Sequence, residues 1–358
     1  MSWEENVRKV VPYVAGEQPQ GRVIKLNTNE FPYAPSPMVA SKMYDLAEGE
    51  IDGATSMLRK YPNMDAENLV NAIAHVYNVP FEKIFVGVGS DDVLAMAFMT
   101  FFNDKEKPVL FPDITYSFYP VWAEMLRIPY VQVPLDENYC IPKDAFEKEN
   151  GGIVFPNPNA PTAILCSRDF IIDVLEKNKD SVVIVDEAYI DFAVAGSSVM
   201  DLTEKYENLL VVRTFSKSRS MAGMRIGYAV GSEKLIKYMS DVKYSYNSYT
   251  MNMPSIAFGA ASIEDEPYFV ETVEKIVKTR EWFVKELENL SFTVLPSSAN
   301  FVFASPAKKN AKELFEKAKE AGIYFRYFNA PRIDTFLRIT IGVDEDMEKV
   351  VEFFKENC

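Results

Sequence analysis

The feature that most constrains this chain is the alternation of short, wholly apolar strands with helical segments between residues 65 and 230. The apolar runs are continuous, which is typical of strands buried on both faces of a parallel sheet. The expected strands are residues 83–88, 108–112, 130–133, 152–155, 182–186, 209–212 and 226–230. The expected helices are residues 65–79, 90–102, 116–127, 168–177 and 199–206. The pattern predicts an α/β domain with a largely parallel sheet between helices.

The pattern changes beyond residue 230. A long helix is expected at residues 268–290, followed by fewer strands that lie beside helices. The expected strands are residues 300–303, 324–328 and 336–341, and the expected helices are 311–321 and 344–354. This part predicts a smaller α+β domain. We expect an N-terminal arm at residues 1–30 that belongs with the small domain, a large domain at 31–245 and the small domain at 246–358.

Charge and composition limit the possible partners and the location. The net charge of −14 disfavours nucleic acid, which requires a basic face. The three cysteines are far apart in the sequence, the N-terminal residues lack the pattern of a signal peptide, and the longest uncharged apolar run, residues 93–102, is too short to cross a membrane. We therefore expect a cytoplasmic protein without a membrane or nucleic-acid partner.

Two strands of the large domain end in residues that can carry out chemistry. Asp186 ends one apolar strand, and Lys217 lies in the polar turn after the next one. Ligands of an open α/β sheet bind at the carboxyl ends of its strands, so the two side chains can converge. An amine able to form a Schiff base and a carboxylate able to keep a pyridine nitrogen protonated are two requirements of pyridoxal phosphate chemistry.

Other residues could hold the rest of such a cofactor. The turn Gly87–Asp91 leads into a helix, whose N-terminus attracts phosphate, and Ser216 and Arg225 flank the lysine. Tyr116 can pack on an aromatic ring. Two further residues that follow strands, Asn159 and Tyr189, can donate hydrogen bonds to a phenolate oxygen.

Each of these features also has a purely structural interpretation. Glycine-rich turns often serve packing alone, and the chain has no GxGxxG or GxxxxGK[ST] motif to favour a dinucleotide or a nucleoside triphosphate. The only histidine, His75, lies in an amphipathic helix and is expected to be structural, so no metal site is expected. The adjacent carboxylates Asp91 and Asp92 are poor evidence for glycosidase chemistry.

Nine short motifs occur in the order that is typical of one family. They lie at residues 26–32, 60–62, 88–91, 115–116, 158–162, 185–189, 213–217, 222–225 and 337–340. On these motifs the chain resembles the fold-type I enzymes that use pyridoxal 5′-phosphate, and among them the histidinol-phosphate aminotransferases of class II. The resemblance covers nearly the whole chain and implies a mostly parallel, seven-stranded sheet.

The resemblance also implies roles for individual residues. Lys217, Asp186 and Tyr189 would be catalytic, with the cofactor bound to Lys217 as a Schiff base. The other cofactor contacts would be Gly89, Ser90, Asp91, Tyr116, Asn159, Thr214, Ser216 and Arg225, with Tyr61 supplied by the partner subunit of a homodimer. Substrate would be bound by Arg338, Arg326, Tyr13 and Asn29. The implied reaction exchanges an amino group between L-histidinol phosphate and 2-oxoglutarate, in histidine biosynthesis.

The chain departs from the family at one motif. Ala160 and Ala163 stand where the family usually has asparagine and glycine, so Asn159 would have to replace the usual asparagine and the turn would differ slightly. Two alternatives remain: an aromatic aminotransferase or phosphothreonine decarboxylase of the same fold, and a noncatalytic sensor that retains the fold. The intact lysine and aspartate disfavour the sensor.

Overall fold

The computed structural model describes residues 3–48 and 60–358, and its largest element is a seven-stranded sheet. The strands are β2 (Ile84–Gly87), β3 (Val109–Pro112), β4 (Tyr130–Val133), β5 (Gly152–Pro156), β6 (Val183–Asp186), β7 (Leu209–Thr214) and β8 (Gly227–Gly231). Their order is β2-β8-β7-β6-β5-β3-β4, and β8 runs antiparallel to both of its neighbours. The predicted mostly parallel, seven-stranded sheet is confirmed.

Helices cover both faces of this sheet. On one face the core includes side chains from α3 (Glu67–Tyr77), α6 (Arg168–Lys177) and α8 (Met253–Glu264). The other face is covered by α4 (Ser90–Phe101), α5 (Phe118–Leu126) and α7 (Glu233–Tyr246). Strand β6 shows why its sequence is continuously apolar: Val183 and Val185 face the first group, and Ile184 faces the second.

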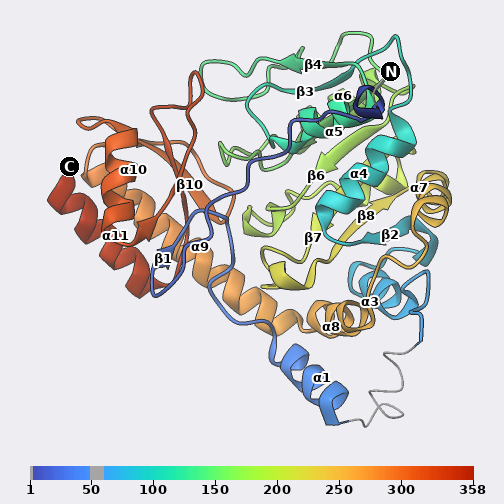
Figure 1. The fold of residues 1–358 in the computed structure, drawn as a ribbon, viewed down its shortest axis with the longest axis horizontal. Coiled ribbons are helices and arrows are strands. Elements are labelled where there is room, and N and C mark those ends of the chain that lie inside the picture. Colours follow the sequence, from blue (N-terminus) through green and yellow to red (C-terminus); the bar gives the residue numbers. More distant parts are fainter. Residues whose placement is uncertain (1–2, 49–59) are drawn as a thin grey trace.

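The C-terminal part forms a second core beside the first (Figure 1). Its antiparallel sheet has the order β12 (Arg326–Tyr327), β13 (Leu337–Thr340), β10 (Phe301–Pro306) and β9 (Phe292–Val294). Three helices contribute apolar side chains to this core: α9 (Glu266–Asn289), α10 (Ala311–Glu320) and α11 (Asp344–Asn357). The long helix α9 follows α8 directly and leads from the large sheet to the second core (Figure 1).

The N-terminal segment connects the two parts. After a short 3-10 helix at Trp3–Asn6 the chain is extended, and it crosses the molecule as the dark blue trace in Figure 1. Strand β1 (Ile24–Lys25) pairs in parallel with β11 (Ile323–Tyr324) of the C-terminal part. Helix α1 (Pro37–Glu48) then packs against α8.

Four local expectations differ from the structure. The segment expected as a helix at 199–206 contains only a 3-10 helix, Met200–Glu204, in which the Leu202 and Lys205 N–H groups donate to carbonyls three residues earlier. The strand expected at 324–328 is split, since β11 pairs with β1 while β12 pairs with β13. Helix α5 begins two residues after Tyr116, and the sequence pattern missed α1, α7 and α8.

The division into domains at 30/31 and 245/246 stays a prediction. Three apolar side chains of α8, those of Ile256, Phe258 and Ile263, belong to the core of the large sheet. This packing favours a boundary near Asp265, between α8 and α9. Among residues 3–48 and 60–358, no helix is both long enough and apolar enough to cross a membrane.

Candidate active site

A cavity of about 480 Å³ lies between the large sheet, the N-terminal segment and the C-terminal sheet. Its size is that of a small-molecule site. Most of the residues predicted for cofactor and substrate line it: Tyr13, Asn29, Ser90, Asp91, Tyr116, Asp186, Tyr189, Thr214, Ser216, Lys217, Arg225, Arg326 and Arg338. The fold therefore gathers side chains from both ends of the chain around one space.

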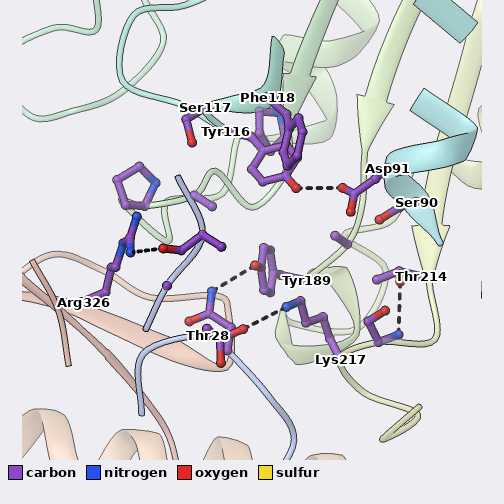
Figure 2. Close-up of a pocket in the computed structure, with 18 of the residues that line it drawn as sticks. Thr28, Ser90, Asp91, Tyr116, Ser117, Phe118, Tyr189, Thr214, Lys217 and Arg326 are labelled. Carbon is purple, nitrogen blue, oxygen red and sulfur yellow. Dashed lines mark hydrogen bonds between the residues drawn. The ribbon is translucent and has the colours of Figure 1, made fainter. Parts of the chain in front are cut away.

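Lys217 extends into this cavity from the turn between β7 and β8. Its Nζ donates to the Thr28 carbonyl at 3.2 Å and lies 5.6 Å from the centre of the Tyr189 ring (Figure 2). The turn is shaped locally, because the Ser216 N–H donates to Thr214 Oγ1 at 3.1 Å. Within residues 3–48 and 60–358 the amine forms an ion pair with no carboxylate, which leaves it available to an electrophile.

Asp186 ends β6, lines the same cavity and is only 5% exposed. Its Oδ1 accepts from the Ala188 N–H at 3.1 Å, and its Oδ2 accepts from the Tyr119 hydroxyl at 3.2 Å. Burial raises the pKa of Asp186 to about 7, despite these two donors. A buried acid of this kind is stabilised in its charged form by a cationic partner.

The start of α4 forms a site suited to an anion. Gly89 precedes the helix with φ of 87°, and a Cβ there would lie 2.4 Å from Arg225 Nη2, so the backbone approaches the guanidinium closely. Arg225 Nη1 contacts Ser216 Oγ at 3.4 Å, and Nη2 contacts Asp91 Oδ2 at 3.3 Å. A helix N-terminus, a hydroxyl and a guanidinium together are typical of phosphate binding.

Tyr116 faces the same space from just before α5. Its hydroxyl donates to Asp91 Oδ1 at 2.7 Å (Figure 2), and burial together with the Asp91 charge raises the pKa of this phenol. The neighbouring Phe118 stacks on Tyr13 of the N-terminal segment, with ring centres 4.2 Å apart. Aromatic rings therefore form one wall of the cavity.

Two arginines approach from the C-terminal sheet. Arg338 Nη2 donates to the Asn27 carbonyl at 2.8 Å, while its buried Nε has no partner among the described residues. Burial lowers the pKa of the Arg338 guanidinium, so an anionic ligand would compensate its lost hydration. Arg326 donates to the Val14 and Ala15 carbonyls at 3.1 and 3.3 Å, and thus holds the N-terminal segment over the cavity.

Asn29 connects the N-terminal segment to the large sheet and to the C-terminal sheet. Its Nδ2 donates to the Tyr189 hydroxyl at 2.9 Å, and its Oδ1 accepts from Thr340 Oγ1 at 3.0 Å. Asn29 also has a left-handed φ of 57°. The hydrogen bond from Asn29 orients the Tyr189 hydroxyl, a contact that the sequence did not suggest.

Three predicted residues do not line the cavity. Asn159 donates to the Ile114 carbonyl and to Thr162 Oγ1 and accepts from Thr115 Oγ1, so its amide is fully used within the protein. This geometry gives no support to a contact between Asn159 and the cofactor. Gly89 acts only through its backbone, and Tyr61 is 80% exposed and stacks on Tyr249.

The turn after Asn159 keeps the conformation that glycine favours. Ala163, which replaces the glycine of the family, has φ of 65° and is fully buried. Its N–H donates to the Asn159 carbonyl at 2.8 Å, which closes the turn. Alanine therefore adopts the left-handed backbone at this position.

Sequence reasoning missed several residues of the site. Thr28, Phe118 and Phe328 line the cavity, and Tyr119 lies behind it on Asp186. Tyr119 follows Tyr116 by three residues, a spacing that would have placed both on one face of the helix expected at 116–127. No signal in the sequence marks Thr28, since it acts through its backbone carbonyl.

A buried ion pair supports the two catalytic strands from the side away from the cavity. Arg213 Nη2 donates to Glu187 Oε2 at 2.9 Å, and the Glu187 side chain is fully buried. Burial alone would lower the pKa of Arg213, but the Glu187 charge raises it well above its ordinary value. Because these residues adjoin Asp186 and Thr214, the pair fixes the ends of β6 and β7 relative to each other.

This fold and this site define an aminotransferase of fold type I. The sequence model described as "Aminotransferase class I and II" matches residues 21–354, and the chain belongs to that family. It is 48% identical over 356 residues to the histidinol-phosphate aminotransferase of Lactococcus lactis, covering 99% of this chain and 96% of that protein. The enzyme of the same name from Clostridium beijerinckii is 48% identical over 351 residues, covering 98% and 95%.

A solved structure with the same fold is that of the histidinol-phosphate aminotransferase from Sinorhizobium meliloti in complex with pyridoxal 5′-phosphate. It superposes with a TM-score of 0.83 at 20% identity and covers 94% of this chain and 92% of that one. The family that the nine motifs predicted is thus confirmed.

Proposed function

We propose that this protein is a pyridoxal phosphate-dependent aminotransferase that exchanges the amino group between L-histidinol phosphate and 2-oxoglutarate. The observation that carries the proposal is that Lys217 and Asp186 line one cavity, in a chain whose relatives bear this enzyme's name. The same relatives disfavour the interpretation as a noncatalytic sensor.

The residues present fit pyridoxal 5′-phosphate. Lys217 offers the amine, and the start of α4 with Arg225 offers an anion site whose close backbone approach a Cβ at Gly89 would block. Asp186 is a buried acid whose raised pKa would fall beside a cationic ring nitrogen. When bound, the cofactor supplies an aldehyde that bonds to amines and a ring that accepts the electron pair released at the substrate Cα.

Within this scheme the protein's residues hold and move protons. Lys217 Nζ takes the proton from the substrate Cα as a general base. The Asp186 carboxylate would accept a hydrogen bond from the ring nitrogen and keep that nitrogen protonated. The Tyr189 hydroxyl, which accepts a hydrogen bond from Asn29, would donate to the phenolic oxygen. Tyr116, which lines the cavity, would pack on the ring and exclude water from that face.

The arginines explain how one site serves two substrates. Glutamate presents a carboxylate and histidinol phosphate presents a phosphate ester, and a guanidinium can bind either through two parallel hydrogen bonds. Arg338, with its unpartnered Nε, supplies such donors. Arg326 and Tyr13 line the same cavity, and we assign them as the second group of substrate contacts.

The proposal includes a homodimer in the cytoplasm. Tyr61 is too exposed to serve the cavity of its own chain, and we assign it to the phosphate of the neighbouring subunit. Its stacking on Tyr249, also exposed, places two aromatic rings on the surface that the partner would cover. Sedimentation of wild-type protein and the Tyr61→Ala variant measures this assembly.

The proposed reaction is tested by the half-reaction of each substrate. We expect glutamate and histidinol phosphate, added separately to the purified yellow enzyme, to convert its absorbance to that of the pyridoxamine form. In a separate sample, borohydride should trap the cofactor on Lys217, and peptide mapping identifies the labelled residue. Lys217→Ala should lose turnover by a factor of at least about 10⁴, because it removes both the covalent attachment and the general base.

The control is phenylalanine, which carries neither a phosphate nor a second carboxylate. Conversion by phenylalanine to the extent seen with glutamate, without conversion by histidinol phosphate, would assign the enzyme to the aromatic aminotransferases. Loss of carbon dioxide from phosphothreonine, without amino transfer, would assign it to the decarboxylases of this fold.

A further inference from the structure

Tyr119, which the proposed mechanism does not use, contacts the acid expected to meet the cofactor. It lies on α5, its side chain is completely buried, and its hydroxyl donates to Asp186 Oδ2 at 3.2 Å. Tyr119 does not line the cavity. It therefore reaches Asp186 from behind, on the side away from any ligand.

The contact leaves Asp186 with a fixed orientation. Its other oxygen, Oδ1, accepts from the Ala188 N–H at 3.1 Å, so each oxygen is held by a donor from a different part of the chain. A carboxylate held at both oxygens cannot rotate freely about its Cβ–Cγ bond. The lone pairs that remain can be directed to one position in the cavity.

The ring of Tyr119 is itself held tightly. It lies 5.8 Å from the ring of Phe111 and 6.1 Å from that of Phe98, both of which are fully buried. It also meets the ring of Tyr116 edge to face, with centres 5.8 Å apart and planes at 87°. Tyr116 is the residue expected to stack on the cofactor, and Asp186 is the residue expected to meet its ring nitrogen. Tyr119 therefore contacts both of these residues.

Resting on the proposed function, we propose that Tyr119 is a positioning residue that orients the Asp186 carboxylate toward the ring nitrogen of the cofactor. A phenol that serves packing alone also needs an acceptor when it is buried, and Asp186 would satisfy it. The two roles differ in what they predict. Only a positioning role links the hydroxyl to cofactor affinity and to its dependence on pH.

The charges around Asp186 define the direction of that dependence. Asp91 from α4 and the adjacent Glu187 both raise its pKa, whereas the hydrogen bonds from Ala188 and Tyr119 lower it. Lys217 lies at the same cavity. Removing the Tyr119 hydroxyl therefore raises the pKa of Asp186 further and leaves less carboxylate to bind the ring nitrogen at neutral pH.

The variant Tyr119→Phe removes one oxygen and keeps the ring. Its matched control is Tyr206→Phe, since Tyr206 is also buried and donates to a carboxylate, Glu176 Oε1 at 2.9 Å, but lies outside the cavity. The cofactor is removed from each holoenzyme, and pyridoxal 5′-phosphate is titrated back across about pH 5.5 to 8.5, a range that includes the pKa of Asp186. Fluorescence quenching gives the dissociation constant.

We expect Tyr119→Phe to bind the cofactor about tenfold more weakly at pH 7, which is typical of the loss of one hydrogen bond to a charged group. The pH at which affinity is half-lost should also move upward. Tyr206→Phe should retain wild-type affinity and pH dependence. Thermal unfolding of the cofactor-free variants reports the stability of each fold separately.

Unchanged affinity and pH dependence in Tyr119→Phe, with wild-type protein still binding cofactor and transferring amino groups, would overturn the positioning role alone. Equal weakening in both variants would also overturn it, because the effect would then follow from stability. If wild-type protein neither binds the cofactor nor is trapped at Lys217, the proposed function itself fails. These results distinguish the two failures.

Discussion

At the scale of single residues, Asp186 shows how burial prepares a side chain for a ligand. The carboxyl is 5% exposed, and desolvation outweighs two hydrogen bonds so that its pKa rises to about 7 from an ordinary value of 3.8. Because the folded protein binds this proton more tightly than the unfolded chain, the group stabilises the fold below its ordinary pKa. That stability is lost as the pH rises through about 7.

This linkage predicts the behaviour of Asp186→Asn without cofactor. The wild-type protein should lose up to about 4 kcal/mol of stability between pH 4 and pH 8 from this one group, since a rise of about three pKa units corresponds to that energy. The asparagine variant lacks the titrating carboxyl and should lose less. Urea unfolding at several pH values measures the difference, and parallel curves for both proteins would contradict the prediction.

At the scale of elements, the placement of α4 depends on its contact with β8. Gly227 in β8 lies directly beneath the helix start, where a Cβ would come within 2.3 Å of Ser90 N and 2.4 Å of Gly89 C. These are backbone atoms, which cannot move aside without shifting the helix. The anion site at Ser90 and Arg225 therefore exists because a strand residue without a side chain lets the helix approach.

Gly227→Ala should move the N-terminus of α4 and weaken the site. We expect the free energy of unfolding to fall by about 1–3 kcal/mol, which is typical of overpacking, and cofactor affinity to fall at least about tenfold. Gly223→Ala is the control, since a Cβ there meets no atom within 4 Å. Chemical unfolding and cofactor titration measure both effects, and wild-type affinity in Gly227→Ala would contradict this account.

At the scale of the whole molecule, the lysine turn contacts the junction between the two cores. Arg219, two residues after Lys217, donates to the carbonyls of Ser262 and Ile263 at the end of α8, at 2.9 and 3.5 Å. Its guanidinium also lies 3.7 Å from the ring centre of Phe269 in α9. Since α8 belongs to the large core and Phe269 packs on the second, Arg219 joins the catalytic turn to both.

Arg219→Ala should therefore affect stability and catalysis together. We expect a loss of about 2–4 kcal/mol in the free energy of unfolding, because two buried carbonyls lose a charged donor. The turnover number should fall as the Lys217 turn loosens. Arg168→Ala is the control: Arg168 pairs with Asp201 at the surface and should cost about 1 kcal/mol or less. Equal effects of the two substitutions would contradict this role of Arg219.

The order of strands and helices in the large domain could be predicted because it depends on short-range patterns. Continuous apolar runs such as Val183–Asp186 form buried parallel strands, and the carboxyl ends of such strands share one edge, so Asp186 and Lys217 had to approach each other. Short elements with competing partners were not predictable. The chain around Phe325 pairs with β1 on one side and β13 on the other, which no local pattern shows.

The amino-acid sequence by itself determined the α/β pattern, the lysine and the acid, because periodicity and strand ends are local properties of a chain. Only the tertiary structure decided that Thr28 meets Lys217, that Tyr119 holds Asp186 and that the Asn159 amide donates to Ile114. These contacts join residues that are tens to hundreds of positions apart. They depend on how separate elements of the folded chain pack against one another, and packing of that range is not encoded in any single segment.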